Sequence, residues 1–157
     1  MTIQTYLEKA GHSMHLIPIG TEEGAYILSN FGKRIVCWEN GNKIHCALQR
    51  SKNVGYYIAV GKSTREKIQA NYQDKLEVII EKDESEYKME VPEEFLEVLA
   101  TDPEAKEYFE QLTEGKQRSL IHLIAKAKHS NTRINRALKI AEKLKWGITD
   151  LKELTRS

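Results

Sequence analysis

The sequence of 157 residues has little of several residue types that mark specialised protein classes. It contains two cysteines and three prolines, so a disulfide-stapled extracellular scaffold is excluded, and we expect free thiols in a reducing cytoplasm. No apolar run approaches the roughly 18 residues of a membrane-spanning helix. The first twenty residues include Glu8 and Lys9 and do not resemble the apolar region of a signal peptide. We therefore expect a cytoplasmic protein with no membrane insertion.

The chain also lacks an excess of charge of one sign. Lys and Arg number 24 and Asp and Glu number 23, so the formal net charge is +1. This balance excludes a uniformly basic nucleic-acid-binding protein, although it leaves room for a local basic patch. With 40% hydrophobic and 30% charged residues, the composition is that of a globular protein of one domain or two small ones.

The two signs of charge are separated along the chain. Residues 81–114 hold 13 acids and three lysines, a net charge of −10. Residues 116–146 hold nine bases and one acid, a net charge of +8. Such an asymmetry is hidden by the near-neutral total and indicates a basic surface in the second part of the chain.

The hydrophobic pattern divides the chain near residue 84. Before it, short runs rich in Ile, Val, Tyr and Thr predict strands, and Asn40-Gly41 between two runs predicts a tight hairpin. After it, the pattern has the period of amphipathic helices. We predict an α+β protein with a β-domain over residues 1–83 and a helical module over residues 84–157. The predicted strands are Thr2–Leu7, His15–Ile19, Arg34–Trp38, Lys43–Leu48, Tyr56–Val60 and Leu76–Glu81.

Capping residues locate the ends of the predicted helices. Pro92 is typical of a helix start, and Asp102-Pro103 is typical of an N-cap followed by the first helical residue. Thr113 is a candidate cap for the next helix, and Gly147 ends the last long one. Asp150 lies where a short final helix would begin.

The β-region contains an internal repeat at an offset of 41 residues. Each half reads as a strand, a glycine, a short helix, an Asn-aromatic pair and a second strand. This order favours a pseudo-two-fold β-barrel within one chain, although two small units could look alike without being a true repeat. The identical pairs are Ile17/Ile58, Gly20/Gly61, Ile27/Ile68 and Asn30/Asn71.

Candidate metal ligands do not converge in the sequence. Across a two-residue hairpin, strand parity places Cys37 and Cys46 on one apolar face and His45 on the other. His12 and His15 have no thiolate or carboxylate cluster near them in sequence. No catalytic motif is present, and the many carboxylates single out no pair. We therefore expect no metal, no cofactor and no enzymatic activity.

The basic residues of the last helices form the best candidate site. On the final long helix, Ile134 and Leu138 belong to a predicted buried stripe, and the bases crowd the opposite side. Such a face could hold phosphate or a carboxylate-rich partner, or it could simply be solvated. The candidate anion- or partner-binding residues are Arg118, Lys126, Lys128, Arg133, Arg136, Lys139 and Lys143.

The second part of the chain resembles the helical module of the bacterial YdeI/OmpD-associated family. The most specific part of the resemblance is Ala127-Lys128 followed, after three residues, by Thr132-Arg133 and then Arg136. Residues 34–83 are similar to the DUF1905 domain that often precedes that module. The similarity is carried by the Asn40-Gly41 hairpin, Cys46-Ala47-Leu48, Gly55-Tyr56-Tyr57, Arg65 and the strand over Leu76–Asp83, with Gln73-Asp74 in place of the usual Gly-Asp.

This resemblance implies a fold and a broad role. The fold would be a double-split β-barrel like that of AbrB/MazE-type transcription factors, followed by an all-α module. The role would be non-catalytic, as a binding or adaptor protein linked to bacteriocin protection or envelope stress, with a protein partner not identified by the sequence. A nucleic-acid-binding regulator that uses the basic helices is the alternative. We expect a monomer, and a dimer through the helices is the alternative to it.

Overall fold

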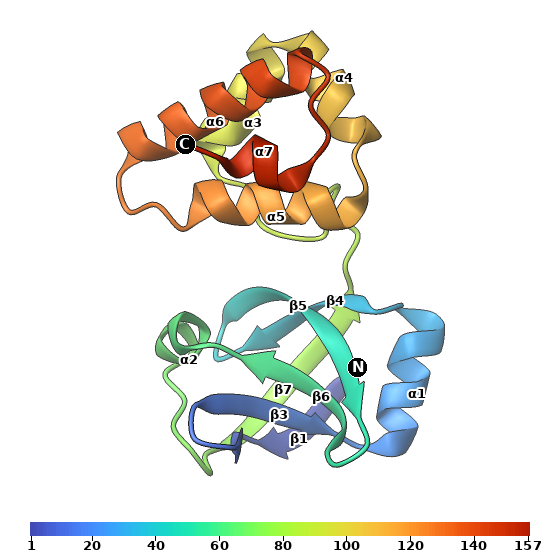
Figure 1. Cartoon of the computed structure of the whole chain (residues 1–157). Coiled ribbons are helices and arrows are strands. Elements are labelled where there is room, and N and C mark those ends of the chain that lie inside the picture. Colours follow the sequence, from blue (N-terminus) through green and yellow to red (C-terminus); the bar gives the residue numbers. More distant parts are fainter. The chain divides into compact units, whose positions relative to one another are not determined.

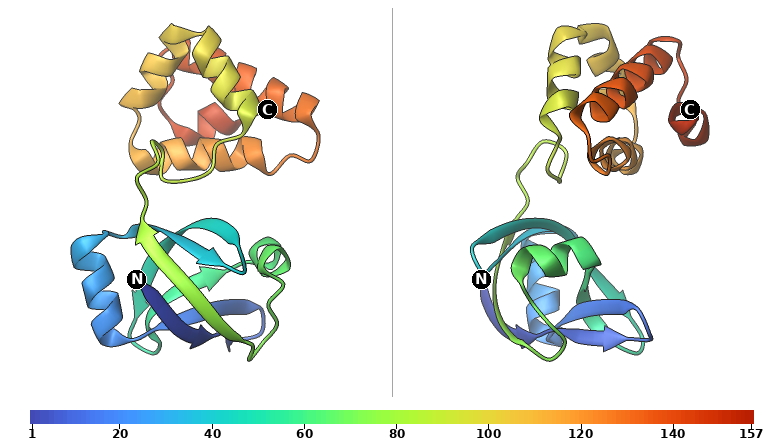
Figure 2. Two further views of the ribbon diagram at one scale, coloured as in Figure 1. Left: turned by 180° about the vertical axis from the view of Figure 1, so that it is seen from behind. Right: turned by 90° about the vertical axis from the view of Figure 1, so that its left-hand side faces the viewer.

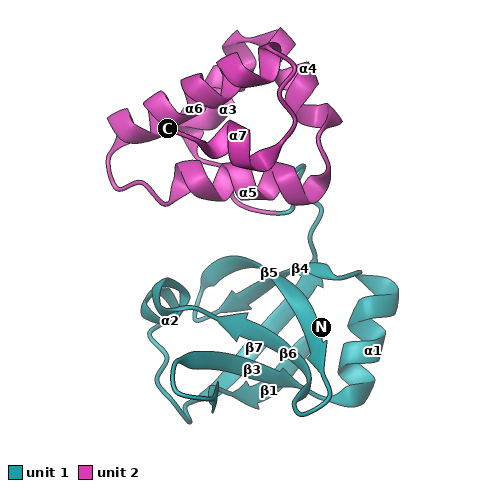
Figure 3. Ribbon diagram, in the orientation of Figure 1, with its two compact units in different colours: residues 1–88 teal, residues 89–157 magenta.

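The computed structural model describes all 157 residues, and the protein belongs to the α+β class (Figure 1). The chain divides into two compact units, residues 1–88 and residues 89–157 (Figure 3). All seven strands and the first two helices lie in the first unit, and the remaining five helices form the second.

The first unit is a curled antiparallel sheet with the strand order β1-β7-β4-β5-β6-β3-β2. The two ends of this order, β1 and β2, are consecutive in the chain and flank Leu7. Leu7 itself donates its N–H to Asp74 O at 3.0 Å and accepts from Gln73 N at 2.8 Å. One N-terminal segment therefore bridges both edges of the sheet. The strands are β1 (Thr2–Tyr6), β2 (Glu8–Ala10), β3 (Met14–Ile19), β4 (Arg34–Glu39), β5 (Asn42–Ser51), β6 (Gly55–Val60) and β7 (Lys75–Lys82).

The internal repeat is present as a structural repeat. Shifting β3 by 41 residues gives the bounds of β6, and the same shift places β4 on β7 and α1 (Thr21–Asn30) on α2 (Lys62–Ile68). Equivalent residues also pair with each other, because Ile17 lies opposite Ile58 and Trp38 lies opposite Ile79. The register of β1 on β7 is likewise that of β5 on β4. A pseudo-two-fold axis thus relates residues 1–41 to residues 42–82.

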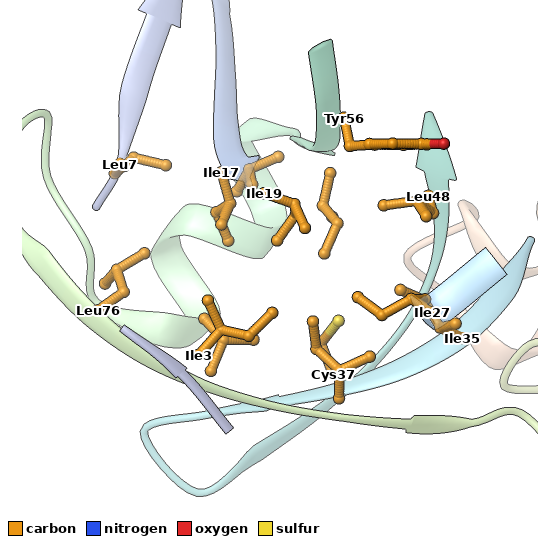
Figure 4. Close-up of a cluster of buried hydrophobic side chains, with 14 of the residues drawn as sticks. Ile3, Leu7, Ile17, Ile19, Ile27, Ile35, Cys37, Leu48, Tyr56 and Leu76 are labelled. Carbon is orange, nitrogen blue, oxygen red and sulfur yellow. The ribbon is translucent and has the colours of Figure 1, made fainter. Parts of the chain in front are cut away.

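The core of this unit lies inside the curled sheet (Figure 4). The helices α1 and α2 flank the sheet at opposite ends (Figure 2) and bury their equivalent isoleucines, Ile27 and Ile68, in that core. The identical isoleucines at these two repeat positions therefore supply equivalent apolar packing from the two helices.

The predicted hairpin and its strand parity are confirmed. Asn40 and Gly41 both have positive φ, as a two-residue turn requires. Cys37 and Cys46 approach each other within the core, with 3.2 Å between the Sγ atoms. The hydrogen bond to Cys46 and burial raise the pKa of the Cys37 thiol. His45 lies on the other face and its Nδ1 is 2.7 Å from Asp83 Oδ2.

The second unit consists of five helices, three of which begin at predicted caps, whereas the N-cap of the long helix Ser130–Lys145 is His129 and makes no side-chain cap bond. Asp102 accepts a hydrogen bond from Ala105 N, Thr113 accepts one from Lys116 N, and Asp150 accepts from Lys152 N. Phe95 and Phe109 form an edge-to-face pair in the interior, with ring centroids 5.1 Å apart. The helices are α3 (Glu93–Thr101), α4 (Pro103–Gln111), α5 (Glu114–Ala125), α6 (Ser130–Lys145) and α7 (Leu151–Thr155). No helix combines the length and the hydropathy that crossing a membrane requires.

The predicted buried stripe of α6 is too wide. Ile134 and Leu138 are 37% and 52% exposed, so their assignment to the core is wrong. The helices packed against α6 bury Ala137, Ile140 and Leu144, and Ile134 and Leu138 lie beyond the edge of that contact. An amphipathic pattern gives the direction of the apolar face, but the neighbouring helices set its width.

Gly24 of α1 tests how tightly this helix packs on the sheet. A Cβ at this position would lie 2.2 Å from Cδ2 of Tyr56, so Gly24→Ala should lower the free energy of unfolding by about 1–3 kcal/mol despite the better helix propensity of alanine. Chemical denaturation followed by circular dichroism measures the change. Gly115→Ala is the matched control, because a Cβ at this helical glycine meets no atom within 4 Å. Equal effects of the two substitutions would contradict the close contact.

Candidate functional site

A hollow of about 360 Å³ lies in the helical unit, where α5, α6 and α7 meet. Its floor is apolar and includes Leu123, Ile140 and Leu154, of which the last two are buried. The remaining lining side chains are polar or basic. They are Lys126, Thr132, Asn135, Arg136, Lys139, Thr155, Arg156 and Ser157.

The side-chain charges that line the hollow are all positive. Lys126, Arg136, Lys139 and Arg156 contribute four cations, and no acidic side chain lines it. Arg136 is held in place by a hydrogen bond from NH1 to Leu123 O at 2.6 Å. No hydrogen bond or ion pair engages the ammonium groups of Lys126 and Lys139, so both are free to bind a ligand.

This arrangement suits a compact anionic group. A guanidinium presents several N–H donors in a fixed plane, and the flexible lysines can adjust around the same acceptor. The volume lies in the usual range of small-ligand pockets, where an apolar floor and a few polar groups bind together. The hollow could therefore hold a carboxylate or phosphate together with an adjoining apolar group.

Arg133, another of the predicted residues, lies outside the hollow and has internal partners. Its Nε and NH2 each lie 2.8 Å from Glu94 Oε1, and its NH1 donates to Ala127 O at 2.8 Å. The Arg133 hydrogen bond, assisted by Ser130, lowers the pKa of Glu94 to about 2. Arg133 therefore joins α6 to α3 and to the end of α5.

The other three predicted residues are also outside the lining. Lys143 donates to Glu153 O at 2.9 Å and to Arg156 O, and so holds the end of α7 against α6. Arg118 forms an ion pair with Glu114 on its own helix at 3.7 Å. Lys128 is exposed in the connection between α5 and α6. The structure thus brings Lys126, Arg136 and Lys139 together and separates the rest.

Sequence reasoning missed the contribution of α7 to this hollow. Thr155 and Arg156 reach it because α7 folds back against α5 and α6, which is a tertiary contact without a local pattern. The cap at Asp150 predicted the helix but not its neighbours. Thr132 belongs to the motif that carries the family resemblance, although nothing in its spacing indicates a lining position.

No group of three His, Cys, Asp or Glu side chains is arranged to hold a metal ion. His45 and Cys46, neighbours in the sequence, point to opposite faces of β5, as the strand parity predicted.

The Glu94–Arg133 pair should contribute to stability in a pH-dependent way. Because the pKa of Glu94 is lower in the folded protein, its contribution is present above about pH 4.5, the ordinary value, and is lost as the pH falls towards about 2. Arg133→Ala should lower the free energy of unfolding more at pH 7 than near pH 2, because only the ion pair with Glu94 is lost on protonation. Denaturation curves at pH 7 and near pH 2 measure this difference, and an equal loss at both values would contradict the role of the pair.

Comparison with known proteins is limited to the helical unit. Residues 88–147 match a family model described as "Bacteriocin-protection, YdeI or OmpD-Associated". The match includes α3 to α6 and ends before α7. Searches of curated proteins and of solved structures give no significant match. The family resemblance predicted for the second part of the chain is therefore confirmed, and this part is similar to proteins named for bacteriocin protection.

Proposed function

We propose that the protein is a non-catalytic binding or adaptor protein of the YdeI/OmpD-associated type, acting in the cytoplasm in bacteriocin protection or envelope stress. Its helical unit binds a carboxylate-bearing segment of a partner protein in the hollow between α5, α6 and α7. The observation that carries the proposal is the convergence of four cations, without a lining acidic side chain, on one apolar-floored hollow. The family match over residues 88–147 supports the broader role.

The distribution of the basic residues favours a compact acceptor over a nucleic-acid backbone. Binding along a backbone requires a row of cations that each neutralise a separate phosphate. Here Arg133 and Lys143 are engaged by internal partners, and Arg156 also pairs with Glu153 at 3.5 Å. Lys126 and Lys139, which have no partner, lie together at the hollow. The net charge of +8 over residues 116–146 keeps a nucleic-acid-binding regulator as the alternative.

The proposal includes a DUF1905-like identity for the first unit, with a barrel of the AbrB/MazE type. The pseudo-two-fold register supports it, because in that fold two equivalent halves each supply part of the barrel. In this chain, residues 1–41 and 42–82 would be those halves. A likeness of fold alone assigns no function to this unit.

Anisotropy of labelled poly-glutamate and of a labelled mixed-sequence DNA duplex, at two salt concentrations, tests the proposal. We expect poly-glutamate to bind and Lys126→Gln/Lys139→Gln to weaken that binding by about tenfold, roughly 1.4 kcal/mol. The matched control is Lys106→Gln/Lys128→Gln, which removes the same charge from the same unit outside the hollow. Binding of both probes is expected to weaken with salt, so the comparison of variants is the decisive measurement.

The outcomes separate the two functions. If both double variants weaken poly-glutamate binding equally, then binding depends on the overall charge of the unit and not on the hollow. That result would overturn the proposed site. Tight, steeply salt-dependent binding of DNA with little binding of poly-glutamate would favour the nucleic-acid alternative. Binding of neither probe would overturn both.

A further inference from the structure

One contact differs between the two halves of the repeat in the first unit. In one half, Tyr56 of β6 packs directly on Gly24 of α1, so closely that a Cβ on the glycine would overlap the ring. The 41-residue shift places His15 of β3 at the position of Tyr56 and Arg65 of α2 at the position of Gly24. A tight aromatic contact in one half is therefore replaced by an imidazole and a guanidinium in the other.

The polar version of this contact has unused hydrogen-bonding groups. His15 is only 8% exposed and its Nδ1 has no hydrogen-bond partner. The Nε of Arg65 is also buried without a partner. A buried polar group without a partner loses its hydration with no hydrogen bond in exchange, and so buried groups of this kind are almost always paired.

A second cation, Lys9, lies near His15. Lys9 of β2 lies directly opposite His15 in the antiparallel register, and paired residues share one face of a sheet. The ammonium of Lys9 lies 5.0 Å from the ring centroid of Tyr72 and forms no ion pair with a carboxylate. Arg65 forms no ion pair either. Burial and then the charges of Arg65 and Lys9 lower the pKa of His15, which places it in a positive environment.

We infer that Lys9, His15 and Arg65 form a binding site for a tetrahedral oxyanion of the phosphate class. The anion would accept hydrogen bonds from His15 Nδ1 and Arg65 Nε, both otherwise unpaired, and its charge would be balanced by Lys9 and Arg65. Phosphate suits donors from three different elements better than a planar carboxylate does, because its oxygens point in different directions. The equivalent place in the other half is closed by the Tyr56–Gly24 contact, so the first unit has one such site and not two.

The site is independent of the hollow proposed for the helical unit. It lies on β2, β3 and α2, whereas the hollow is lined by residues of α5, α6 and α7. A phosphate-bearing ligand here would regulate the protein or be delivered by it, and either role is separate from binding of an acidic partner.

Titration of the full chain with inorganic phosphate, at constant ionic strength and observed by NMR of the histidine side chains, tests the inference. We expect saturable shifts of the His15 imidazole and an upward shift of its pKa, because a bound anion stabilises the protonated ring. His12, which lies in the turn before β3, serves as an internal reference in the same spectra. A chloride titration shows whether any anion gives the same response as phosphate. A sulfate titration shows whether any tetrahedral oxyanion does.

Arg65→Gln should weaken phosphate binding at His15 by about tenfold or more. Arg50→Gln is the matched control, because Arg50 occupies the position of Lys9 in the other half and packs over Tyr56 instead. His15→Tyr combined with Arg65→Gly recreates the closed contact and should abolish binding. Circular dichroism checks that each variant folds.

Three results of the phosphate titration would overturn the inference. They are shifts of His15 that do not saturate, shifts that match those of His12, and shifts that Arg65→Gln leaves unchanged. A response to chloride equal to that of phosphate would show ionic strength acting on the imidazole and would also overturn it. The poly-glutamate experiment tests residues of the second unit. If poly-glutamate does not bind, the result of the phosphate titration is therefore unaffected.

Discussion

Strand pairing between the two halves of the repeat is the constraint on which the first unit depends. Within residues 1–41 the one ladder formed is β2 with β3, and within residues 42–82 it is β5 with β6. Every other ladder joins one half to the other, including the two that contain the paired equivalents Ile17/Ile58 and Trp38/Ile79. Unpaired strand edges are costly and prone to association, so neither half is a stable structure by itself. The shared core, with Ile27 and Ile68 contributed from opposite ends, forms only when both halves are present.

Local chemistry was sufficient to predict most of the elements. The Asn40-Gly41 turn, the caps at Asp102, Thr113 and Asp150 and the parity of Cys37 and Cys46 each follow from the conformational or hydrogen-bonding preference of a few residues. The errors concern contacts between distant elements. The short strand β2 has no apolar alternation of its own and exists because β3 offers it an edge. The exposure of Leu138 and the place of Arg156 depend on where neighbouring helices pack, which no local pattern contains.

The basic segment shows how net charge and available charge differ. Its charge of +8 predicted a single functional face on the last helices. In the folded unit, the arginine of the Thr132-Arg133 motif instead connects α6 to α3, and Lys143 secures the end of α7. Part of the positive charge is thus structural, and it neutralises helix ends and acids of the preceding segment. Of the seven predicted basic residues, three line one hollow: Lys126, Arg136 and Lys139.

The bridging role of residues 2–10 has a consequence for the order in which the protein forms during synthesis. The first strand of this unit, β1, pairs with β7, the last strand of the same unit. Contacts of such large sequence separation form slowly, because a long loop must close before they are made. The nascent first unit must therefore keep β1 and the edge of β4 unpaired until residue 82 has left the exit tunnel. In the second unit the loops to be closed are shorter, because α3 contacts α6 across only the two helices that lie between them in the chain.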